Sequence, residues 1–121
     1  MATILVVEDN PANLKLAVML LEKAGHTVLK AEDGEAGVAL ARQALPDLVL
    51  MDIQMPGIDG LEATRRLRAE AATAGLKIVA LTALAMKGDE QRILEAGCDG
   101  YIAKPFRYQE LLDRVAAALG K

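Results

Sequence analysis

The chain has 121 residues, enough for one domain with its own core and too few for two ordinary domains. Hydrophobic residues make up 53% and charged residues 26% of the chain, a balance typical of a folded globular protein rather than a disordered one. The formal net charge of −3 offers no long-range attraction to nucleic acid or to an anionic membrane. We therefore expect one domain over residues 1–121 that binds neither of them.

Cysteine usage and the amino terminus indicate a cytoplasmic protein. Cys98 is the only cysteine, so no internal disulfide can form, and this fits a reducing compartment. The chain enters an apolar run at once, without the basic and apolar regions of a secretory signal. No apolar run approaches the roughly 20 residues of a membrane helix. We expect cytoplasmic localisation.

Short apolar runs alternate with amphipathic stretches along the chain. The runs predicted as strands are Ile4–Val7, Thr27–Ala31, Leu48–Met51, Ile78–Leu81 and Tyr101–Ala103. Helices are predicted over residues 11–24, 34–44, 60–72, 87–96 and 107–119. Asn10 is suited to cap the first helix and Pro11 to begin it.

Five strands that alternate with five helices predict an α/β fold, a doubly wound parallel sheet with helices on both faces. The flavodoxin-like strand order 2-1-3-4-5 suits a chain of this size, and it makes the first and third strands neighbours at the switch point where ligands bind. Glu8 and Asp9 follow the first strand and Asp52 follows the third, so we expect three carboxylates to converge there. Because clustered carboxylates repel one another, such a pocket favours a bound cation.

Two more strand ends contribute to the same edge of the sheet. Thr82 follows the fourth apolar run and Lys104 follows the fifth. Taken singly, Thr82 is more often a helix cap, Asp52 a turn residue and Lys104 a solvated surface residue. Their joint placement with the acidic residues favours a pocket that accepts a phosphoryl group.

With Glu8-Asp9, Asp52, Thr82-Ala83 and Lys104-Pro105 in this order, the chain resembles the receiver domains of bacterial two-component response regulators over essentially its whole length. Residues 82–90 also resemble stand-alone cell-polarity regulators of the DivK type. The resemblance implies one receiver domain over residues 1–121 without an effector domain. It also implies a signalling switch and not an enzyme, since its chemistry is confined to its own phosphorylation and dephosphorylation.

The resemblance implies a role for each matching acidic residue. Asp52 accepts a phosphoryl group from a histidine kinase or a histidine phosphotransfer protein. Asp9, Asp52 and the backbone carbonyl of Gln54 bind Mg²⁺, and Glu8 contributes through water. This assignment agrees with the preference of Mg²⁺ for oxygen ligands from one or two carboxylates, with several waters retained.

The resemblance further implies a switch. Lys104 contacts one phosphoryl oxygen and Thr82 another, and Tyr101 turns from an outward rotamer into the space that Thr82 vacates. A downstream protein target then reads a population shift on the face formed by residues 87–96, 101–103 and 107–119. The peptide before Pro105 is expected to be cis, and the chain to be a monomer or a weak dimer.

A partner-docking surface is predicted on the first helix. Ala12, Leu16 and Met19 point away from its buried face. Exposed apolar side chains beside an active site suggest that a partner helix docks there. Scattered surface apolar residues are the alternative.

Three other functions are weighed against the switch. A haloacid-dehalogenase-type aspartyl phosphatase requires a second Asp two residues after the nucleophile, where this chain has Gln54. A flavin or nucleotide binder needs a first loop rich in Gly, Ser and Thr, whereas residues 8–11 are acidic. A scaffold that is never phosphorylated is disfavoured by the intact acidic residues together with Thr82 and Lys104.

Overall fold

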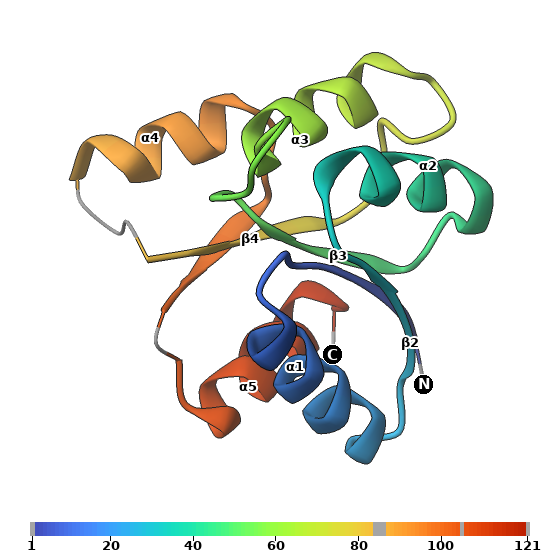
Figure 1. The fold of residues 1–121 in the computed structure, drawn as a ribbon, viewed down its shortest axis with the longest axis vertical. Coiled ribbons are helices and arrows are strands. Elements are labelled where there is room, and N and C mark those ends of the chain that lie inside the picture. The colour runs from blue at the N-terminus through green and yellow to red at the C-terminus, as the bar shows by residue number, and fades with distance from the viewer. Residues whose placement is uncertain (1, 84–86, 105, 121) are drawn as a thin grey trace.

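The structure, a computed structural model, describes residues 2–83, 87–104 and 106–120. Strands and helices alternate throughout (Figure 1). In chain order they are β1 (Thr3–Val7), α1 (Pro11–Lys23), β2 (Thr27–Ala31), α2 (Gly34–Ala44), β3 (Leu48–Asp52), α3 (Gly60–Ala69), β4 (Ile78–Thr82), α4 (Lys87–Glu95), β5 (Gly100–Ala103) and α5 (Tyr108–Ala118).

The strands form one parallel sheet in the order β2-β1-β3-β4-β5, which confirms the predicted fold class and strand order. β1 lies between β2 and β3, and Val7 pairs with Ala31 on one side and with Met51 on the other. The carboxyl ends of β1 and β3 are therefore level. Glu8, which follows Val7, and Asp52, which follows Met51 and ends β3, therefore lie at the same edge of the sheet.

Helices cover both faces of the sheet, with α1 and α5 on one face and α2, α3 and α4 on the other (Figure 1). Each face carries its own apolar layer. Leu5, Met51 and Ile78 belong to the layer under α2, α3 and α4, whereas Ile4, Leu50 and Leu81 belong to the layer under α1 and α5. Because both faces are buried, the inner strands are continuous apolar runs rather than alternating ones.

Side-chain caps determine where the first three helices begin. The Asn10 carboxamide oxygen accepts the N–H groups of Ala12 and Asn13, each at 3.0 Å, and Pro11 is the first helical residue, as predicted. Asp33 and Asp59 cap α2 and α3 in the same way. These caps satisfy backbone donors that a helix leaves unpaired at its start.

The third helix is shorter than predicted, because it ends at Ala69 rather than near residue 72. Glu70 has an extended backbone, and the Thr73 hydroxyl donates to the Leu67 carbonyl at 2.6 Å. The Arg68 guanidinium donates to the carbonyls of the following loop and of Gly97. These hydrogen bonds satisfy backbone carbonyls where the chain leaves the helix. The apolar periodicity of the sequence does not show that the helix ends there. In the described part of the chain, no helix has the length and apolarity to span a bilayer.

Candidate metal centre

Three carboxylates meet at the carboxyl ends of β1 and β3. Glu8, Asp9 and Asp52 each offer an oxygen, and these oxygens lie within 4.8 Å of one another. Glu8 and Asp52 are each only 2% exposed, whereas Asp9 is half-buried. The convergence follows from the strand order, because β1 and β3 are adjacent and end at the same level.

Lys104 reaches the same pocket from the end of β5. Its Nζ lies 2.7 Å from Glu8 Oε1 and 3.4 Å from Asp52 Oδ1. Backbone donors complete the pocket, with the N–H of Asn10 bound to Glu8 Oε2 at 3.2 Å and the N–H of Gln54 bound to Asp52 Oδ1 at 3.1 Å. One ammonium group thus faces up to three negative charges.

Burial and hydrogen bonding shift the pKa values of Glu8 and Asp52 in opposite directions. Burial, with a hydrogen bond to Glu8, raises the pKa of Asp52 to about 7. Burial also acts to raise the pKa of Glu8, but hydrogen bonds with Asp52, Lys104 and Asn10 outweigh it and lower that pKa overall. Below about pH 7, Glu8 and Asp52 therefore retain one proton between them, on the side of Asp52. A bound divalent cation would neutralise the negative charge of this pair in place of the proton.

The donor set fits a hard cation. All three acidic residues offer carboxylate oxygens, and the described cluster contains neither histidine nor cysteine. Mg²⁺ prefers such oxygen ligands. The carboxylates of Asp9, Asp52 and Glu8 thus form an acidic pocket whose chemistry suits Mg²⁺.

Thr82 and Tyr101 lie on the next two strands. Thr82 ends β4 and is fully buried; it follows Leu81, the residue that pairs with Asp52. Tyr101 of β5 is half-buried against the apolar layer on the α4 side. The rotation of Tyr101 stays a prediction, and the predicted cis peptide before Pro105 lies outside the described residues.

Tyr101 contacts both helices that flank β5. Its hydroxyl donates to the Glu90 carboxylate of α4, and its carbonyl accepts a hydrogen bond of 3.2 Å from Arg114 of α5. The hydrogen bond to Glu90 raises the pKa of the Tyr101 phenol. Glu90 and Arg114 were not among the predicted site residues, because nothing in their local sequence pattern indicates contact with a strand.

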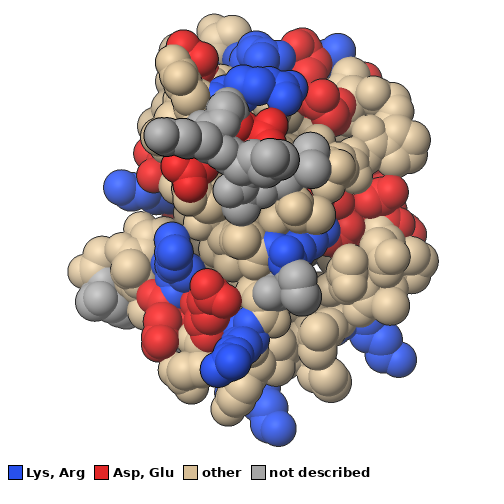
Figure 2. All heavy atoms as spheres, turned by 90° about the vertical axis from the view of Figure 1, so that its left-hand side faces the viewer, with Lys and Arg blue, Asp and Glu red and all other residues tan. Residues whose placement is uncertain are grey.

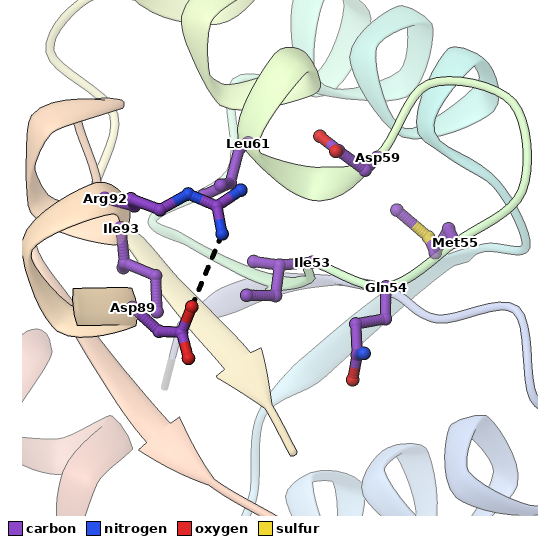
Figure 3. Close-up of a pocket in the computed structure, with 8 residues that line it drawn as sticks. All are labelled: Ile53, Gln54, Met55, Asp59, Leu61, Asp89, Arg92 and Ile93. Carbon is purple, nitrogen blue, oxygen red and sulfur yellow. Dashed lines mark hydrogen bonds and ion pairs between the residues drawn. The ribbon is translucent and has the colours of Figure 1, made fainter. Parts of the chain in front are cut away.

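A hollow of about 410 Å³ opens beside Gln54 (Figure 3). It lies between residues 53–59, the loop that joins β3 to α3, and helix α4, whose Arg92 and Asp89 form an ion pair of 3.4 Å at its edge. Leu61 and Ile93 are buried in its apolar floor. No sequence pattern indicated this hollow, because separate segments form its walls.

The residues of the predicted docking surface on α1 border two different hollows. Ala12, Leu16 and Met19 are all exposed, Leu16 by 45% and Met19 by 54%. Leu16 borders a hollow of about 230 Å³ that Lys104 and Phe106 also line, beside the acidic pocket. Met19 instead borders a groove of about 850 Å³ between α1 and the end of β2.

The carboxyl edge of the sheet carries charges of both signs. On the face shown in Figure 2, basic and acidic side chains lie next to one another in several mixed groups, and uncharged surface lies between the groups. No single sign of charge dominates the visible part of that face. Recognition there therefore depends on local contacts more than on a long-range field.

Comparisons with known proteins agree with this geometry. A protein-family model, the response regulator receiver domain, matches residues 4–116. The chain is 40% identical over 118 residues to the polar-differentiation response regulator DivK of Brucella anthropi, covering 98% of this chain and 96% of that one.

Solved structures of response regulators and receiver domains also resemble this chain. A putative response regulator from Chloroflexus aurantiacus is 35% identical with a TM-score of 0.93, over 99% of this chain and 98% of that one. The receiver domain of a Pseudomonas aeruginosa sensor histidine kinase, with a magnesium ion coordinated in its active-site cleft, is 38% identical with a TM-score of 0.92, over 99% and 98%. The fold, the acidic pocket and these matches show that the chain belongs to the response regulator receiver domain family.

Proposed function

We propose that the protein is a phosphorylatable switch of a two-component or phosphorelay system, with Asp52 as the phosphoacceptor. The observation that carries this proposal is the buried Asp52 carboxylate, which shares its pocket with Glu8, Asp9 and the Lys104 ammonium group. Such a pocket suits a chemistry in which negative charge arrives and must be neutralised. In this proposal residues 1–121 act as one cytoplasmic receiver domain.

Asp9, Asp52 and the backbone carbonyl of Gln54 would hold Mg²⁺, with Glu8 contributing through water. The magnesium ion in the related Pseudomonas aeruginosa receiver domain supports this assignment. Bound Mg²⁺ neutralises charge on the phosphoryl oxygens and orients the phosphodonor. The binding equilibrium is coupled to protons, because Asp52 has to ionise before it can act as a ligand.

The protein's own residues carry out the transfer. A carboxylate oxygen of Asp52 attacks the phosphorus of a phosphohistidine, the P–N bond breaks, and the histidine leaves with its electron pair. Lys104 Nζ, already 3.4 Å from Asp52, would bind one phosphoryl oxygen, and the Thr82 hydroxyl would donate to another. Water later hydrolyses the acyl phosphate and resets the switch.

The phosphodonor would be a histidine kinase or a histidine phosphotransfer protein, and the output would pass to a downstream protein through α4, β5 and α5. Tyr101 supports this route, because it is hydrogen-bonded to Glu90 of α4 and to Arg114 of α5. A new position of Tyr101 would therefore alter contacts with both helices at once. The protein would act as a monomer or a weak dimer.

Incubation with acetyl phosphate and Mg²⁺ tests the proposed function directly. Intact-mass measurement should detect one phosphoryl adduct in the wild type and none in Asp52→Asn, because the amide cannot form the acyl phosphate. The absence of an adduct in a wild type that binds Mg²⁺ would favour the unphosphorylated scaffold. Repeated turnover of p-nitrophenyl phosphate would favour the phosphatase instead.

The position of Leu16 predicts a role in recognising the phosphodonor protein. Leu16→Glu should slow transfer from a histidine kinase by about tenfold, the scale on which interface hot spots act. Transfer from acetyl phosphate should stay unchanged, since this donor does not contact α1. Rates for both donors are compared by quenched-flow labelling.

Met19→Glu is the matched control for this docking prediction. Met19 is also exposed on α1, but it borders the groove beside β2 rather than the hollow next to Lys104. We expect it to affect the kinase reaction less than Leu16→Glu. Equal slowing with both donors, or no effect with either, would contradict a docking role for Leu16.

A further inference from the structure

The loop of residues 53–59 rests on the first residue of α2. A Cβ atom built on Gly34 would lie 2.6 Å from Ile58 Cγ1 and 2.7 Å from the Ile58 carbonyl oxygen. Real Cβ atoms essentially never lie within 3.0 Å of such a neighbour. The missing side chain of Gly34 is therefore what allows Ile58 to lie against α2.

The same loop orients the carboxylate of Asp52. The N–H of Gln54 donates to Asp52 Oδ1 at 3.1 Å. At the end of the loop, Gly60 packs on the strand, since a Cβ there would lie 2.3 Å from the Asp52 carbonyl oxygen and 2.7 Å from Ile53 Cα. The loop thus has fixed ends at Asp52 and Gly60, and Ile58 is its contact with α2 between them.

A side chain at position 34 would displace the loop rather than α2. Gly37 seats α2 directly on β1, because a Cβ there would lie 2.8 Å from Val7 Cγ2. The Arg66–Glu35 ion pair of 3.2 Å further joins α2 to α3. On its other side, the loop borders the hollow of about 410 Å³ shown in Figure 3, so space exists into which it can shift.

We propose that Gly34 is a positioning residue for the metal site. By letting Ile58 rest on α2, it sets the path of residues 53–59, and through Gln54 it sets the orientation of Asp52. The inference rests on the proposed function, because it assigns this loop to Mg²⁺ binding. By this inference α2 supports the metal site, although it contributes no ligand to it.

Gly34→Ala and Gly37→Ala form a matched pair for the test. Both add one methyl group to a buried position of α2 at less than 3 Å from a neighbour, but only Gly34 faces the loop. Gly34→Ala should weaken Mg²⁺ binding by about tenfold, as is typical when support around a metal ligand is altered. Gly37→Ala should lower the melting temperature with little change in Mg²⁺ affinity. Isothermal titration calorimetry gives the affinity, and thermal unfolding in EDTA gives the melting temperature.

Ile58→Ala approaches the same contact from the other side and covers the case in which Gly34→Ala does not fold. It removes Cγ1, Cγ2 and Cδ1, so it should loosen the loop and weaken Mg²⁺ binding by a smaller factor than Gly34→Ala. Ile58→Ala removes the side-chain part of the clash with a Cβ at position 34 but keeps the Ile58 carbonyl oxygen, which would lie 2.7 Å from it. The added loss of affinity caused by Gly34→Ala should therefore be smaller in the Ile58→Ala background than in the wild type. A difference of this kind is not expected from general destabilisation.

The outcomes separate this inference from the proposed function. A wild type that does not bind Mg²⁺ would overturn both. A wild type that binds Mg²⁺, together with affinities in Gly34→Ala and Ile58→Ala equal to its own, would overturn the positioning role alone. The positioning role would also be overturned if Gly34→Ala and Gly37→Ala lost Mg²⁺ affinity in the same proportion to their loss of melting temperature.

Discussion

Replacing Asp52 by Asn should raise the free energy of unfolding of the metal-free protein at pH 8 by roughly 1–3 kcal/mol, with a smaller gain at pH 5. The pKa of Asp52 is about 7 in the folded protein against an ordinary value of 3.8. Between these values the folded state keeps a proton that the unfolded state releases, so the wild type loses stability as the pH rises from about 4 to 7. Asn carries no charge at any of these pH values. Urea unfolding of both proteins in EDTA at the two pH values measures the difference.

Two controls test whether the stability gained by Asp52→Asn comes from removing the carboxylate charge. One is the addition of Mg²⁺, and the other is a second substitution. Saturating Mg²⁺ should stabilise the wild type more than Asp52→Asn, because the variant has lost a ligand, and the advantage of Asn should shrink. Asp113→Asn, at an exposed position on α5, should change stability by no more than about 0.5 kcal/mol at either pH. An equal gain for Asp52→Asn at both pH values would show that the carboxylate charge is not its source.

Replacing Lys104 by Met should destabilise the metal-free protein by roughly 2–4 kcal/mol at neutral pH. Glu8, which is 2% exposed, would keep its backbone donor but lose the ammonium group at 2.7 Å. Mg²⁺ should recover much of this stability, since it supplies positive charge to the same carboxylates. Unfolding in urea with and without Mg²⁺ measures both effects.

Mg²⁺ should not restore the phosphorylation rate of Lys104→Met. The metal can replace the charge of Lys104 beside Glu8, but it cannot supply the contact that Lys104 makes with a phosphoryl oxygen in the proposed reaction. We expect transfer from acetyl phosphate to be slower by about 100-fold at saturating Mg²⁺. Lys15→Met removes an exposed lysine that forms no ion pair among the described residues, and should change neither quantity. Normal phosphorylation of Lys104→Met would reduce Lys104 to a structural partner of Glu8.

The fold could be predicted because its determinants are local in the sequence. Short apolar runs such as Ile4–Val7 are typical of strands with both faces covered, and their alternation with helices favours a parallel sheet with crossover connections. Asn10 and Pro11 mark the start of α1 by hydrogen-bonding rules that operate within one turn. The approach of Glu8 and Asp9 to Asp52 then follows from strand order alone.

Packing between segments far apart in the sequence decided the rest. The raised pKa of Asp52 depends on how deeply it is buried and on its distance from Glu8, and neither quantity can be read from sequence spacing. The division of the α1 surface depends on where β2 and Phe106 lie beside it. The contact of Gly34 with Ile58 depends on tenths of an ångström between α2 and a loop. Which residues reach the edge of the sheet could be predicted, because short-range patterns in the chain specify strands, caps and strand order. The protonation of these residues and the contacts that support them could not be predicted, because they depend on distances between side chains that come together only on folding.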